Sequence, residues 1–304
     1  MKTNDTHRLF SMLTITLVTA ACATSTEADS TSLPELNPAT VTTALAATST
    51  TDTTVVDGCQ RPLTEPGEYE GSLEGIPNQL YWVIVPDSYK DTAPVPLYLH
   101  LAAGSGDHDS FLAGWRPYLD DLAGVMVMVN TADPARGKPE ALTALIDELT
   151  SEFCIDPKRI HALGTSWSGG MVGTLACESS DRIASFVSAL SGHVPPAGCD
   201  PERPVPLLSF TGDVDRTQVA ALVETWAGIN GCDPDPKVED LGSGVLRKTF
   251  ENCEADVLFY DIVGMGHAWP LHEAVGPGAE LIAVYEEVDY LDEAVRFFTE
   301  HPLP

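Results

Sequence analysis

The sequence has few basic residues, and this shortage limits the ligands that it can bind. Of its 304 residues, 16 are lysine or arginine and 45 are aspartate or glutamate, so the formal net charge is -29. Binding to nucleic acid needs lysine and arginine to neutralise the phosphates, and we therefore expect no nucleic-acid partner. The acidic excess instead indicates a solvated surface whose self-repulsion would be screened by salt.

Metal-binding motifs and membrane-spanning runs are also lacking. No CxxC pair occurs together with a matching set of histidines or cysteines, so we expect no structural zinc site, and no motif implies a cofactor. The apolar run Leu9–Ala21 is too short to cross a bilayer comfortably. No contiguous apolar lid is visible in the sequence, which disfavours an interfacial lipase that acts on long-chain lipids.

The N-terminus instead has the pattern of an export signal, with residues 1–22 as the leader. Two forms of processing remain open. Thr19-Ala20-Ala21-Cys22 resembles a bacterial lipoprotein signal, in which a lipidated Cys22 would tether the protein to a membrane, whereas Ala21-Cys22-Ala23 suits an ordinary signal peptidase. Residues 23–57 are rich in Thr, Ser and Ala, so we predict a disordered tether, and this tether favours the lipoprotein.

Six cysteines remain after Cys22, and an even number in an exported chain suggests three disulfides. One predicted pair brackets a segment rich in Pro, Asp and Gly. A second joins cysteines that we place at the same edge of the sheet, and the third follows by elimination. The predicted pairs are Cys232–Cys253, Cys154–Cys177 and Cys59–Cys199.

Residues 58–304 are predicted to form one α/β domain, with a mostly parallel sheet covered by helices on both faces. Short apolar runs alternate with helical stretches, and residues 232–249 form either a hairpin or a rim loop. The predicted strands are Leu80–Val85, Pro96–Leu101, Val125–Val129, Arg159–Leu163, Ser185–Leu190, Pro206–Phe210 and Val257–Ile262. The predicted helices are Phe111–Leu122, Glu140–Phe153, Gly169–Cys177, Gln218–Ile229 and Ala279–Phe298. A monomer is expected.

The most informative segment is Arg159–Met171, in which a predicted strand ends at Gly164 and a helix follows directly. Its Gly-Thr-Ser-Trp-Ser pattern is nearly the G-x-S-x-G nucleophile elbow, a strained turn that lifts a serine hydroxyl above a sheet. Ser166 is therefore the candidate nucleophile, and the backbone N–H of Trp167 is a candidate oxyanion donor. Two alternatives remain open: the serine could simply cap the helix, or Ser168, which replaces the second glycine, could react instead.

Candidate partners for the serine follow two later strands, in the order serine, acid, histidine. The loop after the strand Pro206–Phe210 offers Asp213 and Asp215. The loop after the strand Val257–Ile262 carries His267 between small residues. Both loops therefore come at the carboxyl ends of strands, where an acid and a histidine can meet a nucleophile.

The segment Asp156–Ser166 resembles the "D-P-x-R-V-Y-x-x-G-x-S" sequence of polyhydroxybutyrate depolymerase and feruloyl esterase-like α/β-hydrolases, also called the LpqC-like group. Pro204–Asp215 continues the similarity, and Gly266–Pro270 resembles the "G-H-x-W-P" of that family. The resemblance covers most of the chain from Tyr81 onward. It implies the α/β-hydrolase fold and a serine carboxylic ester hydrolase that forms an acyl-enzyme without a cofactor or metal.

Residue by residue, the resemblance places the nucleophile on Ser166, the acid on Asp215 and the histidine on His267. Leu101 stands where the family has the glycine of an "H-G" pair, so its N–H is the second candidate oxyanion donor and its side chain crowds that place. Trp269, like Trp167, is expected to wall the acyl site.

The resemblance implies feruloyl- or acetyl-polysaccharide esters, or short hydroxyalkanoate polyesters, as substrates. A peptidase on the same fold is the less favoured enzyme. The rival from another class is a non-catalytic or weakly active surface lipoprotein, which the altered elbow and the altered oxyanion segment favour. His108 and His193 could approach the mouth of the site, but each is interpreted as a solvated loop residue.

Overall fold

The computed structural model describes residues 65–72, 80–90, 92–102, 115–116, 118–119, 121, 124–130, 139–215, 219–271 and 282–304. The predicted leader and tether, together with Cys22, Cys59 and His108, lie outside the described residues.

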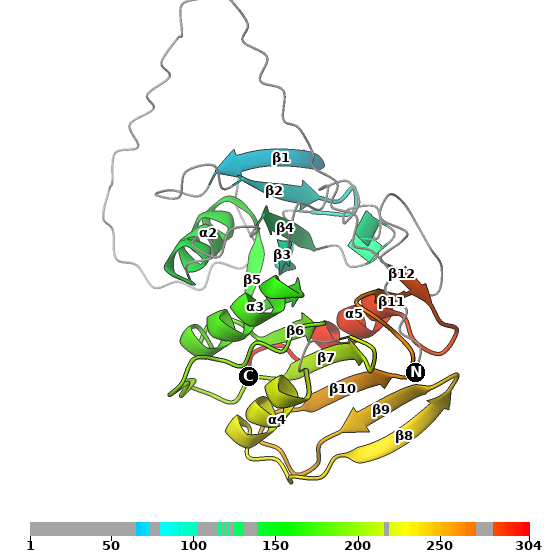
Figure 1. The fold of residues 1–304 in the computed structure, drawn as a ribbon. Coiled ribbons are helices and arrows are strands. Elements are labelled where there is room, and N and C mark those ends of the chain that lie inside the picture. Colours follow the sequence, from blue (N-terminus) through cyan, green and yellow to red (C-terminus); the bar gives the residue numbers. More distant parts are fainter. Residues whose placement is uncertain are drawn as a thin grey trace, which may run out of the picture. The chain divides into compact units, whose positions relative to one another are not determined.

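A ten-stranded sheet organises the described part of the chain, in the order β1-β2-β4-β3-β5-β6-β7-β10-β9-β8 (Figure 1). Its six central strands, from β4 to β10, are parallel, and antiparallel strands flank them on both sides. The strands are β1 (Gly67–Ser72), β2 (Leu80–Val85), β3 (Val95–Ala102), β4 (Val125–Asn130), β5 (Ile155–Thr165), β6 (Ser185–Ala189), β7 (Leu207–Gly212), β8 (Lys237–Gly242), β9 (Val245–Thr249) and β10 (Val257–Ile262).

Several central strands are buried along nearly their whole length because both of their faces are covered. All residues of β3, β6 and β7 are buried, and β4 is buried except for its last residue. The edge strand β8 is different, since its first four residues are exposed and three of them are charged. This pattern is the one expected for a parallel sheet between two helical layers, so the predicted fold class is confirmed.

Helices cover the two faces unequally. α2 (Pro139–Glu152), α3 (Trp167–Glu178) and α4 (Val219–Ile229) pack into the apolar cluster on one face. α5 (Tyr290–Glu300) packs into the cluster on the other face. Asp289 starts α5 because its carboxylate accepts hydrogen bonds from the N–H groups of Leu291 and Asp292.

The expected helix Ala279–Phe298 is wrong in its first half. Residues Ile282–Val284 form a short strand, β12, which pairs in parallel with β11 (Trp269–Leu271). The helix begins only at Tyr290, directly after the Asp289 cap. Of the expected helix Phe111–Leu122, the residues that the structure describes are helical.

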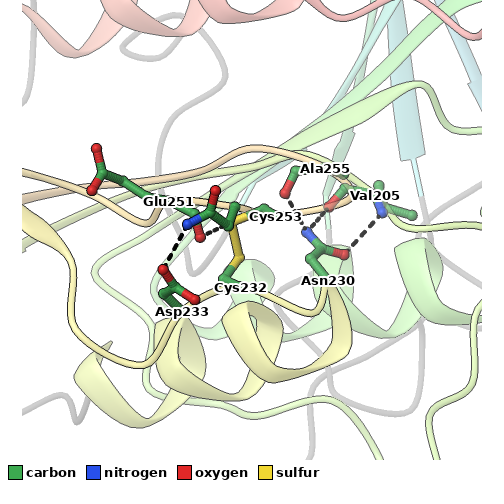
Figure 2. Close-up of a disulfide and its surroundings, with 8 residues drawn as sticks. Val205, Asn230, Cys232, Asp233, Glu251, Cys253 and Ala255 are labelled. Atoms are coloured by element: carbon green, nitrogen blue, oxygen red, sulfur yellow. Dashed lines mark hydrogen bonds between the residues drawn. A yellow bond between two sulfur atoms is a disulfide. The ribbon is translucent and has the colours of Figure 1, made fainter.

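Residues 232–249 contain the whole β8–β9 hairpin, one of the two alternatives left open by the sequence. The predicted disulfide Cys232–Cys253 is confirmed and closes the base of this hairpin (Figure 2). Beside it, the buried Asn230 side chain donates hydrogen bonds to the carbonyl oxygens of Val205 and Ala255 at 2.9 and 3.2 Å, and accepts one from Val205 N–H at 3.2 Å. The hairpin is thus joined to both the end of α4 and the start of β7.

The other two predicted pairings are wrong. Cys177, at the end of α3, pairs with Cys199 in the loop after β6. Cys154 is itself disulfide-bonded, but not to Cys177. The cause is the path of the chain after β6, which brings residues 191–199 back across the end of α3 and which no sequence spacing indicated.

Within the described residues, no helix is long and apolar enough to cross a membrane. The same residues contain no group of three or more His, Cys, Asp or Glu side chains arranged to hold a metal ion.

Two histidines in the sheet, His100 and His161, are buried. His161 stacks against both Tyr98 and Phe298, with ring centroids 5.9 and 4.9 Å away, and its Nδ1 lies 2.9 Å from Ser185 Oγ. Burial lowers the pKa of each imidazole from 6.5 to about 3. Between these two values the unfolded chain binds protons that the folded chain does not, so the free energy of unfolding falls as the pH drops through this window.

We predict that replacing both members of the His161–Ser185 pair, as His161→Phe with Ser185→Ala, flattens this acid dependence. One proton accounts for at most about 1.4 kcal/mol per pH unit, so the slope of unfolding free energy between pH 6 and 4 should fall by up to that amount. Urea unfolding at several pH values measures it. An unchanged slope would show that His161 is protonated in the folded protein.

Candidate active site

Ser166 occupies the turn between β5 and α3 with an unusual backbone conformation. Its φ and ψ are 59° and −125°, a left-handed region that a serine rarely adopts. Its N–H donates to Ala189 O at 2.8 Å, which fixes the turn to the end of β6. Its side chain makes no capping hydrogen bond to the helix, although Ser166 stands at the N-cap position. A strained turn that leaves its hydroxyl outside the helix cap is typical of a nucleophile elbow rather than of a simple cap.

Glycines allow the strand and the helix to approach closely around this turn. A Cβ on Gly164 would lie 2.6 Å from the carbonyl oxygen of Ser168, and one on Gly169 would lie 2.6 Å from the Cβ of Ser191. Real Cβ atoms do not come so close to backbone. Ser168 itself is completely buried in the first turn of α3. A substrate therefore has no direct access to the Ser168 side chain.

The acid and the histidine meet because β7 and β10 are neighbours in parallel register. Gly212, the last residue of β7, lies opposite Ile262, the last residue of β10, so the two following loops leave the same edge of the sheet. Asp215 Oδ2 lies 2.9 Å from His267 Nδ1. The Asp215 side chain is 5% exposed and that of His267 is 43% exposed, so the carboxylate is covered while the ring remains accessible. This arrangement can hold one tautomer of the imidazole with Nε2 available for proton transfer.

Ser166 and His267 are not hydrogen-bonded to each other among the described residues. Such contacts are often long in unliganded active sites and shorten when substrate is bound. Trp269, two residues after His267, stacks on Tyr290 with ring centroids 5.9 Å apart. Burial raises the pKa of the Tyr290 phenol.

Trp167 and His193 form a pair beside the nucleophile. Their rings meet edge-to-face with centroids 4.7 Å apart, and the Trp167 side chain is 42% exposed. A Cβ on Gly170 would lie 2.4 Å from the Cβ of His193, so the His193 loop packs directly on the first turn of α3. His193 is exposed in its loop, as we expected from the sequence, but it also lies against the turn that carries Ser166. No sequence signal marked it, because the contact depends on the path of the loop after β6.

Leu101 lies inside β3, opposite Val129 on one side and Gly164 on the other. Its side chain is fully buried in the cluster with α3. The role of its N–H as an oxyanion donor remains a prediction, as does that of the Trp167 N–H. Residues 103–114, which follow β3, lie outside the described residues.

Comparison with solved structures identifies this architecture. Acetyl xylan esterase from Aspergillus awamori superposes with a TM-score of 0.57 at 10% identity, over 77% of this chain and 99% of that chain. The chain has the α/β-hydrolase fold. A dipeptidyl aminopeptidase IV-like protein from Bacteroides ovatus superposes with a TM-score of 0.51 at 12% identity, over 78% of this chain and 36% of that chain. At such identities the likeness shows the fold alone.

Sequence relatives are named as esterases and a depolymerase. Feruloyl esterase B from Piromyces equi is 33% identical over 148 residues, or 40% of this chain and 27% of the relative. Probable feruloyl esterase C from Aspergillus niger is 28% identical over 212 residues, which are 62% of this chain and 75% of the relative. Poly(3-hydroxyalkanoate) depolymerase C from Paucimonas lemoignei is 26% identical over 181 residues, which are 47% of this chain and 44% of the relative. The matched segment thus spans only about a quarter of the Piromyces protein.

No protein-family model matches this α/β-hydrolase. The predicted resemblance to feruloyl esterases and polyhydroxyalkanoate depolymerases is nevertheless confirmed by these relatives.

We predict that Gly164→Ala disrupts the elbow, because the added methyl group would collide with the Ser168 carbonyl. Overpacking of this kind costs about 1–3 kcal/mol of unfolding free energy, and esterase activity should fall with it. Gly173→Ala, in the adjoining helix α3, is the control, since its Cβ would meet only Trp226 Nε1 at an ordinary 3.8 Å. Alanine is the better helix former by about 1 kcal/mol, so that variant should be neutral or more stable. Urea unfolding compares the two, and equal effects would contradict the steric explanation.

Proposed function

We propose that this α/β-hydrolase is an exported serine carboxylic ester hydrolase with Ser166 as nucleophile, His267 as general base and Asp215 as the acid that orients it. The observation that carries the proposal is the combination of a strained Ser166 turn with the 2.9 Å contact between His267 Nδ1 and Asp215 Oδ2. Both features come from the same edge of the parallel sheet, the edge at which ligands bind in open α/β folds.

The proposed reaction follows from these roles. His267 Nε2 takes the Ser166 proton as the oxygen attacks the ester carbonyl, and the protonated imidazole then donates to the departing alcohol. Asp215 holds the ring orientation and stabilises its positive charge. The N–H groups of Trp167 and Leu101 are the proposed oxyanion donors. A water molecule, activated by His267, then releases the acid and regenerates Ser166.

The proposed substrates are feruloyl- or acetyl-polysaccharide esters, or short hydroxyalkanoate polyesters. Relatives named for the first and last of these classes support both. The half-exposed Trp167, packed edge-to-face on His193, offers a flat apolar surface beside Ser166, which suits an aromatic ring or a polyester repeat. The net charge of -29 would repel an anionic polymer or an anionic membrane.

Export is supported by the leader-like N-terminus and by the disulfides Cys177–Cys199 and Cys232–Cys253, which form and persist in oxidising compartments. Release by signal peptidase and lipidation of Cys22 are the two forms of this proposal. Mass measurement of the N-terminal peptide from the native host distinguishes them, because lipidation adds acyl groups to Cys22.

The second candidate is a surface lipoprotein that has kept the fold with little or no turnover. The observations that favour it are Ser168 in place of glycine and the missing hydrogen bond between Ser166 and His267. A fluorophosphonate probe separates the two candidates, because only an activated serine reacts with it.

We predict that Ser166→Ala abolishes both probe labelling and ester hydrolysis, with a loss of at least about 10⁴-fold, as for other serine nucleophiles. Ser168→Gly is the matched control, because it changes the other serine of the turn into the residue usual at that place. It should keep most of both signals. Labelling that survives in Ser166→Ala and disappears in Ser168→Ala would transfer the nucleophile to Ser168.

We predict highest activity on nitrophenyl esters with C2 to C4 acyl chains. The reason is the absence of an apolar lid in the sequence, since a long acyl chain needs a contiguous apolar surface to leave water. Chain-length profiles of kcat/KM on the purified mature protein measure this. A maximum at C12 or longer would contradict the proposed substrate class.

A further inference from the structure

Hydrogen bonds hold the acid loop and the histidine loop side by side. Asp213 N–H donates to Ile262 O at 3.2 Å, and Val214 N–H donates to Met265 O at 3.2 Å. The approach is so close that a Cβ on Gly212 would lie 1.9 Å from the Met265 carbonyl oxygen. These backbone contacts therefore hold the acid loop and the histidine loop together.

One side chain adds to this backbone pairing. Asp213 Oδ1 accepts a hydrogen bond from the N–H of Gly264 at 2.6 Å. Gly264 has a φ of +81° and starts the turn that leads to His267. Within that turn, Ala268 N–H donates to Gly266 O at 2.9 Å, across His267. Asp213 thus holds the first residue of a short glycine-rich turn whose tip carries the histidine.

Asp213 and Asp215, in the same loop, bind different parts of the histidine loop. Asp215 contacts the His267 ring, whereas Asp213 contacts the backbone three residues before it. Val263 N–H also donates to Gly244 O, in the β8–β9 turn, at 2.9 Å. Met265, on the other side of Gly264, is also held by backbone hydrogen bonds, to Ile262 and Val214. Among the described residues, the bond to Asp213 is the only hydrogen bond of Gly264 itself, so Asp213 fixes the glycine between these two anchored neighbours.

We infer that Asp213 is a positioning residue, which clamps the Gly264 N–H and so sets the reach of His267 toward Ser166. This inference rests on the proposed triad. A loosened turn would leave Asp215 and His267 in contact but would make the imidazole spend less time within reach of the serine hydroxyl. The chemical step would therefore slow, while substrate binding beside Trp167 would change little.

The inference is tested with three variants and a nitrophenyl acetate assay. Asp213→Ala removes the acceptor, and Asp213→Asn keeps a neutral oxygen that can still accept from Gly264. Asp240→Ala is the matched control, because Asp240 also accepts from a glycine N–H, that of Gly242 at 3.0 Å, but within its own hairpin turn. The readouts are kcat, KM, the rate and final extent of fluorophosphonate labelling, and amide hydrogen exchange of residues 263–268.

The clamp predicts that Asp213→Ala lowers kcat and the labelling rate roughly tenfold, with KM within about twofold and complete final labelling. Asp213→Asn should recover most of that loss, and Asp240→Ala should match the unaltered protein. Exchange of residues 263–268 should be faster in Asp213→Ala alone.

Unchanged kcat in Asp213→Ala, or equal losses in Asp213→Asn or in Asp240→Ala, would overturn the clamp. If the unaltered protein neither labels nor hydrolyses esters, the proposed function fails. Hydrogen exchange then decides the clamp by itself: faster exchange in Asp213→Ala than in Asp213→Asn supports it, and equal exchange overturns it.

Discussion

The parallel pairing of β7 with β10 is the interaction on which the candidate site depends. The two strands are far apart in sequence, separated by α4 and the β8–β9 hairpin, yet they end in register at Gly212 and Ile262. A slip of one residue would turn every side chain of β10 to the opposite face. The pairing is held in register by burial, since all six residues of β7 and four of the six residues of β10 are buried. Their large apolar side chains alternate between two separate apolar clusters. The short distance between an acid and a histidine is therefore a consequence of core packing.

Much of this arrangement could be predicted from the sequence. The central strands were found because runs such as Val125–Val129 are apolar throughout, a pattern that a strand buried on both faces requires. The candidate residues were found because small residues and a serine, then an aspartate, then a histidine follow such strands in the order that this fold uses. Local sequence carries this information because each of these loops begins where its own strand ends.

The rest could not be predicted, because it depends on contacts between segments far apart in the chain. β1 is exposed over most of its length, so no hydrophobic pattern marks it, and only pairing with β2 makes it a strand. The sequence predicts a helix at β12 because its three residues carry no turn signal. They form a strand only because they pair with the short β11. The pairing of Cys177 with Cys199 and the contact of His193 with Trp167 both depend on the loop after β6.

The serine in place of the second elbow glycine is the sequence feature that most weakened the expected function, and packing explains how the turn accommodates it. In this turn Gly164 lies directly against the backbone of Ser168, so residue 164 is the one that cannot carry a Cβ. The next close approaches, to Ser191 and His193, fall on Gly169 and Gly170. The helix thus meets its neighbours one residue later than the G-x-S-x-G pattern assumes, and the pair of glycines after Ser168 supplies the space. A motif defined by spacing can therefore be altered by one residue while the steric condition that it represents is still met.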